Sequence, residues 1–126
     1  MTGSCLCGAI RFEIDGELGP ITCCHCSQCR RASGTAFATN ANVARSAHRF
    51  TAGAELIAEY ESSPGKLRAF CSRCGSPMYS RMVSEPDRLG TIDGDPGGQP
   101  VLHVWTADKA AWYSIHDTLP QLPEVR

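Results

Sequence analysis

The chain has 126 residues, and its 12 Lys and Arg residues nearly balance its 13 Asp and Glu residues, which gives a net charge of -1. Because no long basic or acidic run is present, a general affinity for nucleic acid or for anionic membranes is not expected. No segment approaches the roughly 20 apolar residues that span a bilayer. The length of the chain predicts a single domain over residues 1–126.

Short strands separated by turns account for most of the first third of the chain. Residues 5–16 place Ile10, Phe12 and Ile14 on one face of an expected strand, with charged residues between them. A second apolar piece, residues 21–23, leads into a cluster of cysteines. Residues 27–33 then have the length of about two helical turns and end at Gly34, a residue typical of helix C-termini.

The remainder of the chain is also patterned as strands. Residues 35–43, 55–62, 66–71, 77–83 and 101–107 are expected strands, separated by turns such as 52–53 and 63–65. Residues 85–100 are rich in Asp, Gly and Pro and predict a loop, and residues 117–126 predict an extended tail. The sum is a small, mostly antiparallel, mainly β domain with one short helix.

Eight cysteines are the chemically most informative residues. The N-terminus lacks the charged and then apolar regions of a signal peptide, so we expect a cytoplasmic protein. In a reducing compartment, cysteines more often bind metals or perform thiol chemistry than form disulfides.

Two cysteine pairs far apart in the sequence predict a closed metal site. Cys5 and Cys7 would share one face of a strand, while Cys71 and Cys74 have the spacing of a zinc knuckle. A glycine after each pair permits a positive φ, which turns backbone N–H groups toward the thiolates. Four thiolates complete a tetrahedral zinc, so this site should be structural.

The remaining four cysteines lie within residues 23–29 and leave two interpretations open. One ligand set is Cys24, Cys26 and Cys29, and the other replaces Cys24 with Cys23. The evenly spaced second set resembles an iron–sulfur run, but such runs continue to a fourth cysteine followed by proline, and arginines follow here. We therefore expect three thiolates around a zinc whose fourth position is open, as in catalytic sites.

A thiolate-rich zinc is a weak Lewis acid toward water and favours sulfur as a further ligand, which predicts chemistry on a thiol and an aldehyde rather than hydrolysis. Arg30 and Arg31 are candidates to bind an acidic cosubstrate. His25, between two ligands, is interpreted as lying beside the metal or at the surface, with metal ligation as the alternative. The other three histidines are expected to be structural: His48, His103 and His116.

Four stretches carry a family resemblance: GSCLCG, CCHCSQCRRASG, FCSRCGSPMY and HVWTADKAAWYSIHDTLPQLPE. From Gly3 to about Pro123 the chain resembles the glutathione-dependent formaldehyde-activating enzymes and centromere protein V, a family with a zinc-bearing β-tent fold. The resemblance implies a structural zinc on Cys5, Cys7, Cys71 and Cys74, and an exchangeable catalytic zinc on Cys24, Cys26 and Cys29, which glutathione can displace.

The reaction that the resemblance implies is a carbon–sulfur lyase reaction, the formation of S-hydroxymethylglutathione from glutathione and formaldehyde. A non-enzymatic binding module with two structural metals is the main alternative, as centromere protein V membership would allow. A third possibility is a redox or metal-handling protein that uses Cys23 and Cys24. This ranks last because adjacent cysteines rarely form a comfortable disulfide. The oligomeric state is not predicted.

Overall fold

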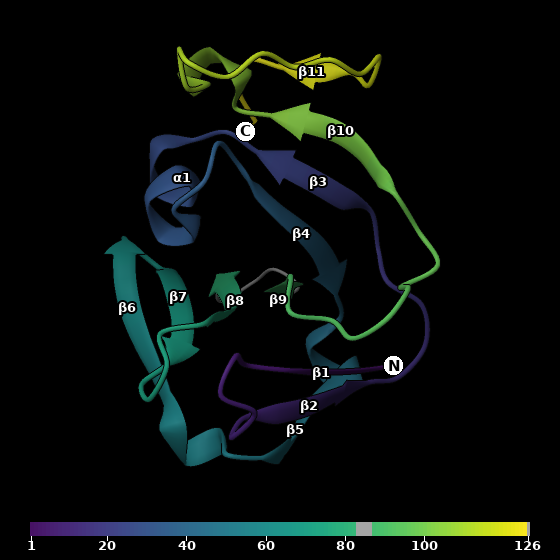
Figure 1. Ribbon diagram of the computed structural model, residues 1–126, viewed down its shortest axis with the longest axis vertical. Coiled ribbons are helices and arrows are strands. Elements are labelled where there is room, and N and C mark those ends of the chain that lie inside the picture. The colour runs from purple at the N-terminus through teal and green to yellow at the C-terminus, as the bar shows by residue number, and fades with distance from the viewer. Residues whose placement is uncertain (83–86, 126) are drawn as a thin grey trace. The chain divides into compact units, whose positions relative to one another are not determined.

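The computed structural model describes residues 1–82 and 87–125, and these divide into two compact units. The first unit comprises Met1–Gly19 and Ala41–Gly98, and the second comprises Pro20–Asn40 and Gln99–Arg126. The described chain is mainly β, as the sequence predicted, and Figure 1 shows its elements. That residues 1–126 form one domain stays a prediction.

The regular elements of the described residues are short. The strands are β1 (Thr2–Ser4), β2 (Arg11–Ile14), β3 (Ile21–Cys24), β4 (Ala38–Val43), β5 (His48–Ala52), β6 (Ile57–Ser63), β7 (Lys66–Cys71), β8 (Pro77–Met82), β9 (Asp87–Leu89), β10 (Pro100–Val104) and β11 (Gln121–Leu122). The helices are α1 (Ser27–Ser33) and the 3-10 turns η1 (Arg45–Ala47), η2 (Ala54–Leu56) and η3 (Thr106–Asp108). In the part of the chain that the structure describes, no helix is long and apolar enough to cross a membrane.

The first unit contains two antiparallel arrangements of strands. β1, β2 and β5 form a three-stranded sheet in which Phe12 pairs with Gly3 on one side and with Phe50 on the other. The hairpin of β6 and β7 continues through β8 to β9, and β9 pairs with the last residues of β4, Ala41 opposite Leu89.

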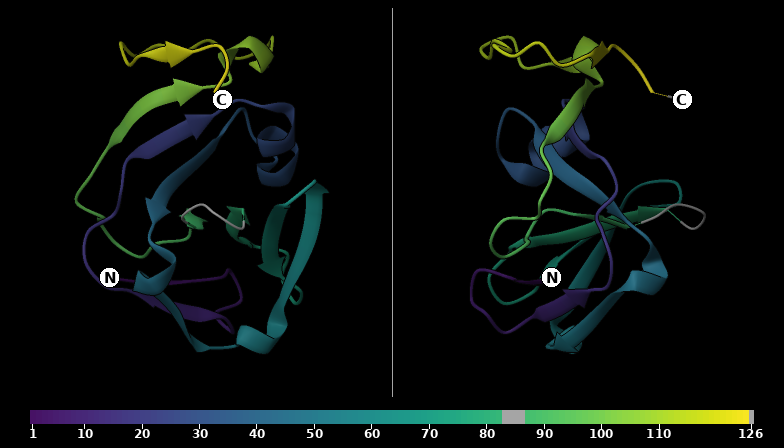
Figure 2. Two further views of the ribbon diagram at one scale, coloured as in Figure 1. Left: turned by 180° about the vertical axis from the view of Figure 1, so that it is seen from behind. Right: turned by 90° about the vertical axis from the view of Figure 1, so that its right-hand side faces the viewer.

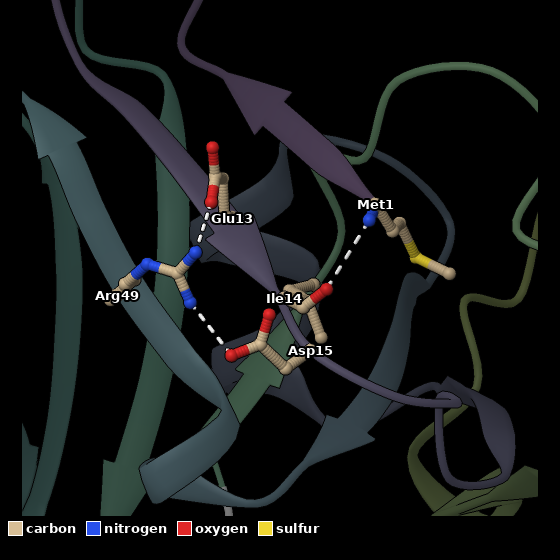
Figure 3. Close-up of polar contacts among 5 residues, drawn as sticks. All are labelled: Met1, Glu13, Ile14, Asp15 and Arg49. Carbon is tan, nitrogen blue, oxygen red and sulfur yellow. Dashed lines mark hydrogen bonds and ion pairs between the residues drawn. The ribbon is translucent and has the colours of Figure 1, made fainter.

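Polar contacts at the surface accompany the three-stranded sheet (Figure 3). The terminal amine of Met1 donates to the carbonyl of Ile14 at 3.2 Å. Arg49 on β5 pairs with Glu13, and it also contacts Asp15 with 2.7 Å between Nη1 and Oδ2. Exposed pairs of this kind contribute about 0–1 kcal/mol each, so burial of the apolar face contributes more to holding these strands together.

The core of the first unit is formed by the predicted apolar face of β2 and by two of the predicted ligand cysteines. Its buried members are Cys5, Ile10, Phe12, Ile14, Val43, Cys71 and Met78. Ile10, Phe12 and Ile14 are at most 2% exposed, which confirms the predicted alternation. Cys5 and Cys71 therefore approach one another inside a packed core.

The second unit is built on parallel strand pairing, which the sequence analysis did not predict. β10 pairs in parallel with β3, placing His103 opposite Cys23, and β11 pairs in parallel with β10 (Figure 2). The helix α1 follows β3 and ends as predicted, because Gly34 adopts a left-handed conformation with φ of 72° and its N–H donates to Arg30 O.

Several local predictions were wrong, among them the strand over residues 101–107, which ends at Val104 and is followed by η3. Cys5 and Cys7 lie in a turn after β1 and not in a strand, and the N–H of Gly8 closes this turn on Cys5 O at 3.1 Å. β5 was not predicted, because its five residues gain their strand partner from β2 rather than from a clear apolar alternation. β9 lies inside the predicted loop of residues 85–100, of which 85 and 86 fall outside the described residues.

Gly53 joins β5 to η2 and packs against the turn that carries the first two cysteines. Its φ is +74°, and a Cβ there would lie 2.2 Å from Ala9 O. We expect Gly53→Ala to lower the free energy of unfolding by about 1–2 kcal/mol for the left-handed backbone and by about 1–3 kcal/mol more for the clash.

Urea unfolding of the metal-loaded protein measures this loss, with Gly16→Ala as the matched control. Gly16 also has a positive φ, +81°, but a Cβ there meets no atom of the described residues within 4 Å. Equal destabilisation by the two substitutions would show that the contact with Ala9 contributes nothing.

Candidate metal-binding sites

Four cysteines converge in the first unit. Cys5 and Cys7 come from the turn after β1, Cys71 is the last residue of β7, and Cys74 lies in the turn before β8. All four sulfurs lie within 4.8 Å of one another, with 3.5 Å between Cys5 and Cys7 and 3.9 Å between Cys7 and Cys71. Tetrahedral zinc with ordinary Zn–S bonds requires sulfurs about 3.8 Å apart, so the spacing fits this ion.

Backbone N–H groups surround these sulfurs, as the two glycines predicted. Gly8 and Gly75 have φ of +77° and +78°. The donors and their sulfurs are Ile10 to Cys5 at 3.4 Å, Arg73 to Cys71 at 3.4 Å, Ala9 to Cys7, and Ser76 to Cys74. Such N–H groups stabilise thiolates and orient them, which suits a permanently bound cation.

The pKa values of these thiols show how closely the four sulfurs interact. Burial opposes ionisation of Cys5, yet hydrogen bonds from the Ile10 N–H and from the neighbouring thiols lower its pKa to about 6. The N–H of Ala9 favours the Cys7 thiolate, but hydrogen bonding with Cys5, together with burial, raises its pKa to about 11. Thiolates this close repel one another, and a divalent cation removes the conflict, so the donor set fits zinc.

Three cysteines converge in the second unit. Cys24 ends β3, Cys26 is the N-cap of α1, and Cys29 lies in the first turn of the helix. Their sulfurs also lie within 4.8 Å of one another, and among the described residues no fourth Cys, His, Asp or Glu ligand atom joins them. The N–H of Cys29 donates to the Cys26 sulfur at 3.2 Å, so the helix cap itself orients one candidate ligand.

The structure brings together Cys24, and not Cys23, with the other two sulfurs. Hydrogen bonds to Cys26 and Cys29, reinforced by burial, raise the pKa of Cys24 well above that of an ordinary thiol. Three thiolates at this spacing also require a cation, which again fits zinc. Cys23 is buried outside the group, and burial raises the pKa of its thiol.

The sequence of both sites agrees with a known family. Residues 1–108 match the family model described as glutathione-dependent formaldehyde-activating enzyme. The chain belongs to this family. The sequence resemblance is thereby confirmed over most of the chain.

Individual relatives of this formaldehyde-activating family support the assignment. The chain is 33% identical over 129 residues to a Halomonas elongata protein named "Putative glutathione-dependent formaldehyde-activating enzyme", covering 91% of this chain and 80% of that protein. It is 31% identical over 77 residues to a Schizosaccharomyces pombe protein named as an uncharacterized lyase, and the match covers 61% of this chain and 54% of that protein. A crystal structure of a Rhodobacter sphaeroides protein matches with a TM-score of 0.65 and 28% identity, covering 79% of this chain and 98% of that chain.

The two arginines predicted to bind a cosubstrate occupy different environments in this family member. Arg30 is half-buried, and its Nε donates to His25 O at 3.3 Å, which fixes the guanidinium beside the three-cysteine loop. Arg31 is exposed on α1. Among the predicted structural histidines, His48 packs its ring against Phe50, and His116 is exposed.

A buried histidine pair is the feature of this family member that the sequence analysis missed. His25 Nε2 lies 2.8 Å from His103 Nδ1, and His103 Nε2 lies 2.9 Å from Asp117 Oδ2. Both histidines are almost fully buried, at 0% and 2% exposed, while Asp117 reaches solvent. His103 was treated as an isolated structural residue, because no local signal relates positions 78 residues apart.

Proposed function

We propose that the chain is a zinc-dependent carbon–sulfur lyase that adds glutathione to formaldehyde, giving S-hydroxymethylglutathione, or catalyses a closely related thiol–aldehyde reaction. The observation that supports this most directly is the group of three sulfurs from Cys24, Cys26 and Cys29, which no fourth ligand atom joins among the described residues. An incomplete sulfur set leaves a coordination position for a substrate.

The two cysteine groups have different roles in this proposal. Zinc on Cys5, Cys7, Cys71 and Cys74 is structural, because four thiolates fill its coordination and tie the start of the chain to β7. Cys24, Cys26 and Cys29 would hold a zinc ion that, when bound, would supply a position for a substrate thiol and favour loss of the thiol proton.

The reaction requires no oxidant or reductant. A sulfur–carbon bond forms as the thiol adds to the carbonyl carbon, the carbon–oxygen π bond breaks, and the proton of the thiol ends on the new hydroxyl group. The protein has to hold the two reactants in contact, and Arg30 is suitably fixed for this, since its guanidinium sits beside the cysteine loop. Arg30 and Arg31 would bind the carboxylates of glutathione.

Exchange of ¹³C-labelled formaldehyde with S-hydroxymethylglutathione, followed by NMR, tests this function. The zinc-loaded protein should accelerate exchange above the spontaneous rate, and the acceleration should be larger for glutathione than for 2-mercaptoethanol, which has no carboxylates. Removal of the second zinc with a chelator should return exchange to the spontaneous rate. We expect two zinc ions per chain before chelation.

A protein that binds two zinc ions but accelerates exchange with neither thiol would contradict the enzymatic function. The non-enzymatic binding module would then explain the sites better, and its second zinc would resist both chelator and glutathione.

Since the chemistry needs reduced cysteines, the proposal also places the protein in the cytoplasm.

A further inference from the structure

His25 is held in the three-cysteine loop by both its main chain and its side chain. Its N–H donates to Val104 O at 3.0 Å, and its carbonyl accepts the Nε–H of Arg30. Its ring packs against Phe37, with 4.9 Å between centroids, and Nε2 bonds to His103. The main chain and the side chain of His25 are therefore both fixed. In the sequence, His25 is the direct neighbour of two candidate ligands.

The contact of His103 with Asp117 determines which ring nitrogen donates in each hydrogen bond of the histidine pair. The Asp117 carboxylate accepts hydrogen bonds, so His103 Nε2 carries a proton and donates to it. A neutral His103 then has a bare Nδ1, which accepts the Nε2–H of His25. This leaves His25 Nδ1 as a bare acceptor, and among the residues that the structure describes the buried Nδ1 indeed has no hydrogen-bond partner.

The reverse order is unfavourable. It would have His103 Nδ1 donate to His25 Nε2 and would leave a proton on His25 Nδ1, which has no acceptor among the described residues, and buried N–H groups without acceptors are rarer than buried acceptors without donors. The hydrogen bond to Asp117 therefore fixes the tautomer of His103, and the hydrogen bond between the two rings then fixes the tautomer of His25.

The histidine pair supports the cysteine loop from its opposite side. Successive side chains of an extended segment alternate, and Cys24 and Cys26, on either side of His25, have their sulfurs in one group that includes neither ring nitrogen of His25. His25 acts on the two thiolates through the backbone that it anchors, not as a ligand.

We propose that Asp117 is a positioning residue for the three-cysteine site: through His103 it fixes the ring of His25 and so preorganises the thiolates of Cys24 and Cys26 for the metal. This inference rests on the proposed function in one respect, that these sulfurs bind zinc. Partners behind metal ligands typically change metal affinity by about 10–100-fold when removed.

Zinc affinity of the second site, measured by chelator competition in Asp117→Ala, provides the first test. We expect affinity to fall by about 10–100-fold at the three-cysteine site and to stay unchanged at the four-cysteine site. Asp117→Asn keeps Oδ1, which accepts from the Leu119 N–H at 3.0 Å and lies 3.2 Å from His103 Nε2, so it should restore part of the affinity. Asp108→Ala removes an exposed acid from η3 and should have no effect.

The ¹⁵N NMR resonances of the histidine rings in the zinc-loaded wild type provide a second test, which does not depend on any variant. We expect protonated Nε2 and bare Nδ1 at both His25 and His103, and loss of this fixed pattern in Asp117→Ala.

A proton on His25 Nδ1 in the wild type, or unchanged affinity in Asp117→Ala, would overturn the inference. Wild-type protein that binds zinc only at the four-cysteine site would instead contradict the proposed function, so the two failures are distinguishable.

Discussion

Cys71→Ser should remove one zinc ion and strongly destabilise the protein. Cys71 is 0% exposed and belongs both to the sulfur group and to the core of the first unit. Structural zinc sites contribute on the order of 10 kcal/mol to folding, so loss of one thiolate should cost several kcal/mol. We expect the midpoint of thermal unfolding, followed by circular dichroism, to fall by roughly 10 °C or more.

Cys23→Ser is the matched control, because it makes the same substitution at a buried cysteine outside both sulfur groups. It should retain both zinc ions in elemental analysis and lose much less stability, since the Thr39 side chain already hydrogen-bonds to the group at this position. Equal loss of stability in the two variants would mean that the four-cysteine site contributes no more than ordinary core packing.

Cys26→Ser should abolish the proposed reaction while the protein stays folded. Cys26 is the N-cap of α1 and accepts the Cys29 N–H, and serine is among the best N-cap residues. The helix therefore keeps its cap, and the change replaces a candidate thiolate with a hydroxyl group. A metal centre contributes several kcal/mol to such a reaction, so we expect the rate to fall on the order of a thousandfold.

Elemental analysis and the formaldehyde exchange assay measure this effect together. Cys26→Ser should retain one zinc ion, unfold close to the wild-type temperature, and exchange formaldehyde at the spontaneous rate. A variant with two zinc ions and wild-type exchange would contradict the assignment of the second site.

Local patterns explain why part of the fold could be predicted from the sequence. The helix over residues 27–33 and its end at Gly34 depend on residues a few positions apart, and so does the alternation of Ile10, Phe12 and Ile14. β5 and β9 have weak patterns of their own and become strands because neighbouring strands supply their hydrogen bonds.

The cysteine groups were predictable for a related reason. Thiolate pairs one to three residues apart have few uses, so their spacing predicts a metal even where the backbone prediction is wrong, as it was for the turn at Cys5 and Cys7. The choice between Cys23 and Cys24 was left open by spacing alone. In the structure β3 ends at Cys24, and the sulfur of Cys24, not that of Cys23, lies with those of Cys26 and Cys29.

The sequence by itself therefore determined the mainly β class, the helix, the family and the four-cysteine set, and it narrowed the second set of sulfurs to two alternatives. Only the tertiary structure decided which residues support the loop that carries the second set of sulfurs. The parallel pairing of β10 with β3 places His103 opposite Cys23, and the following segment brings Asp117 to its ring. Strand pairing between distant segments depends on the burial of whole faces, so no neighbouring residue in the sequence specifies it. Three residues that seemed unrelated along the chain thereby form one hydrogen-bonded series, which runs from the buried His25 and His103 to the exposed Asp117.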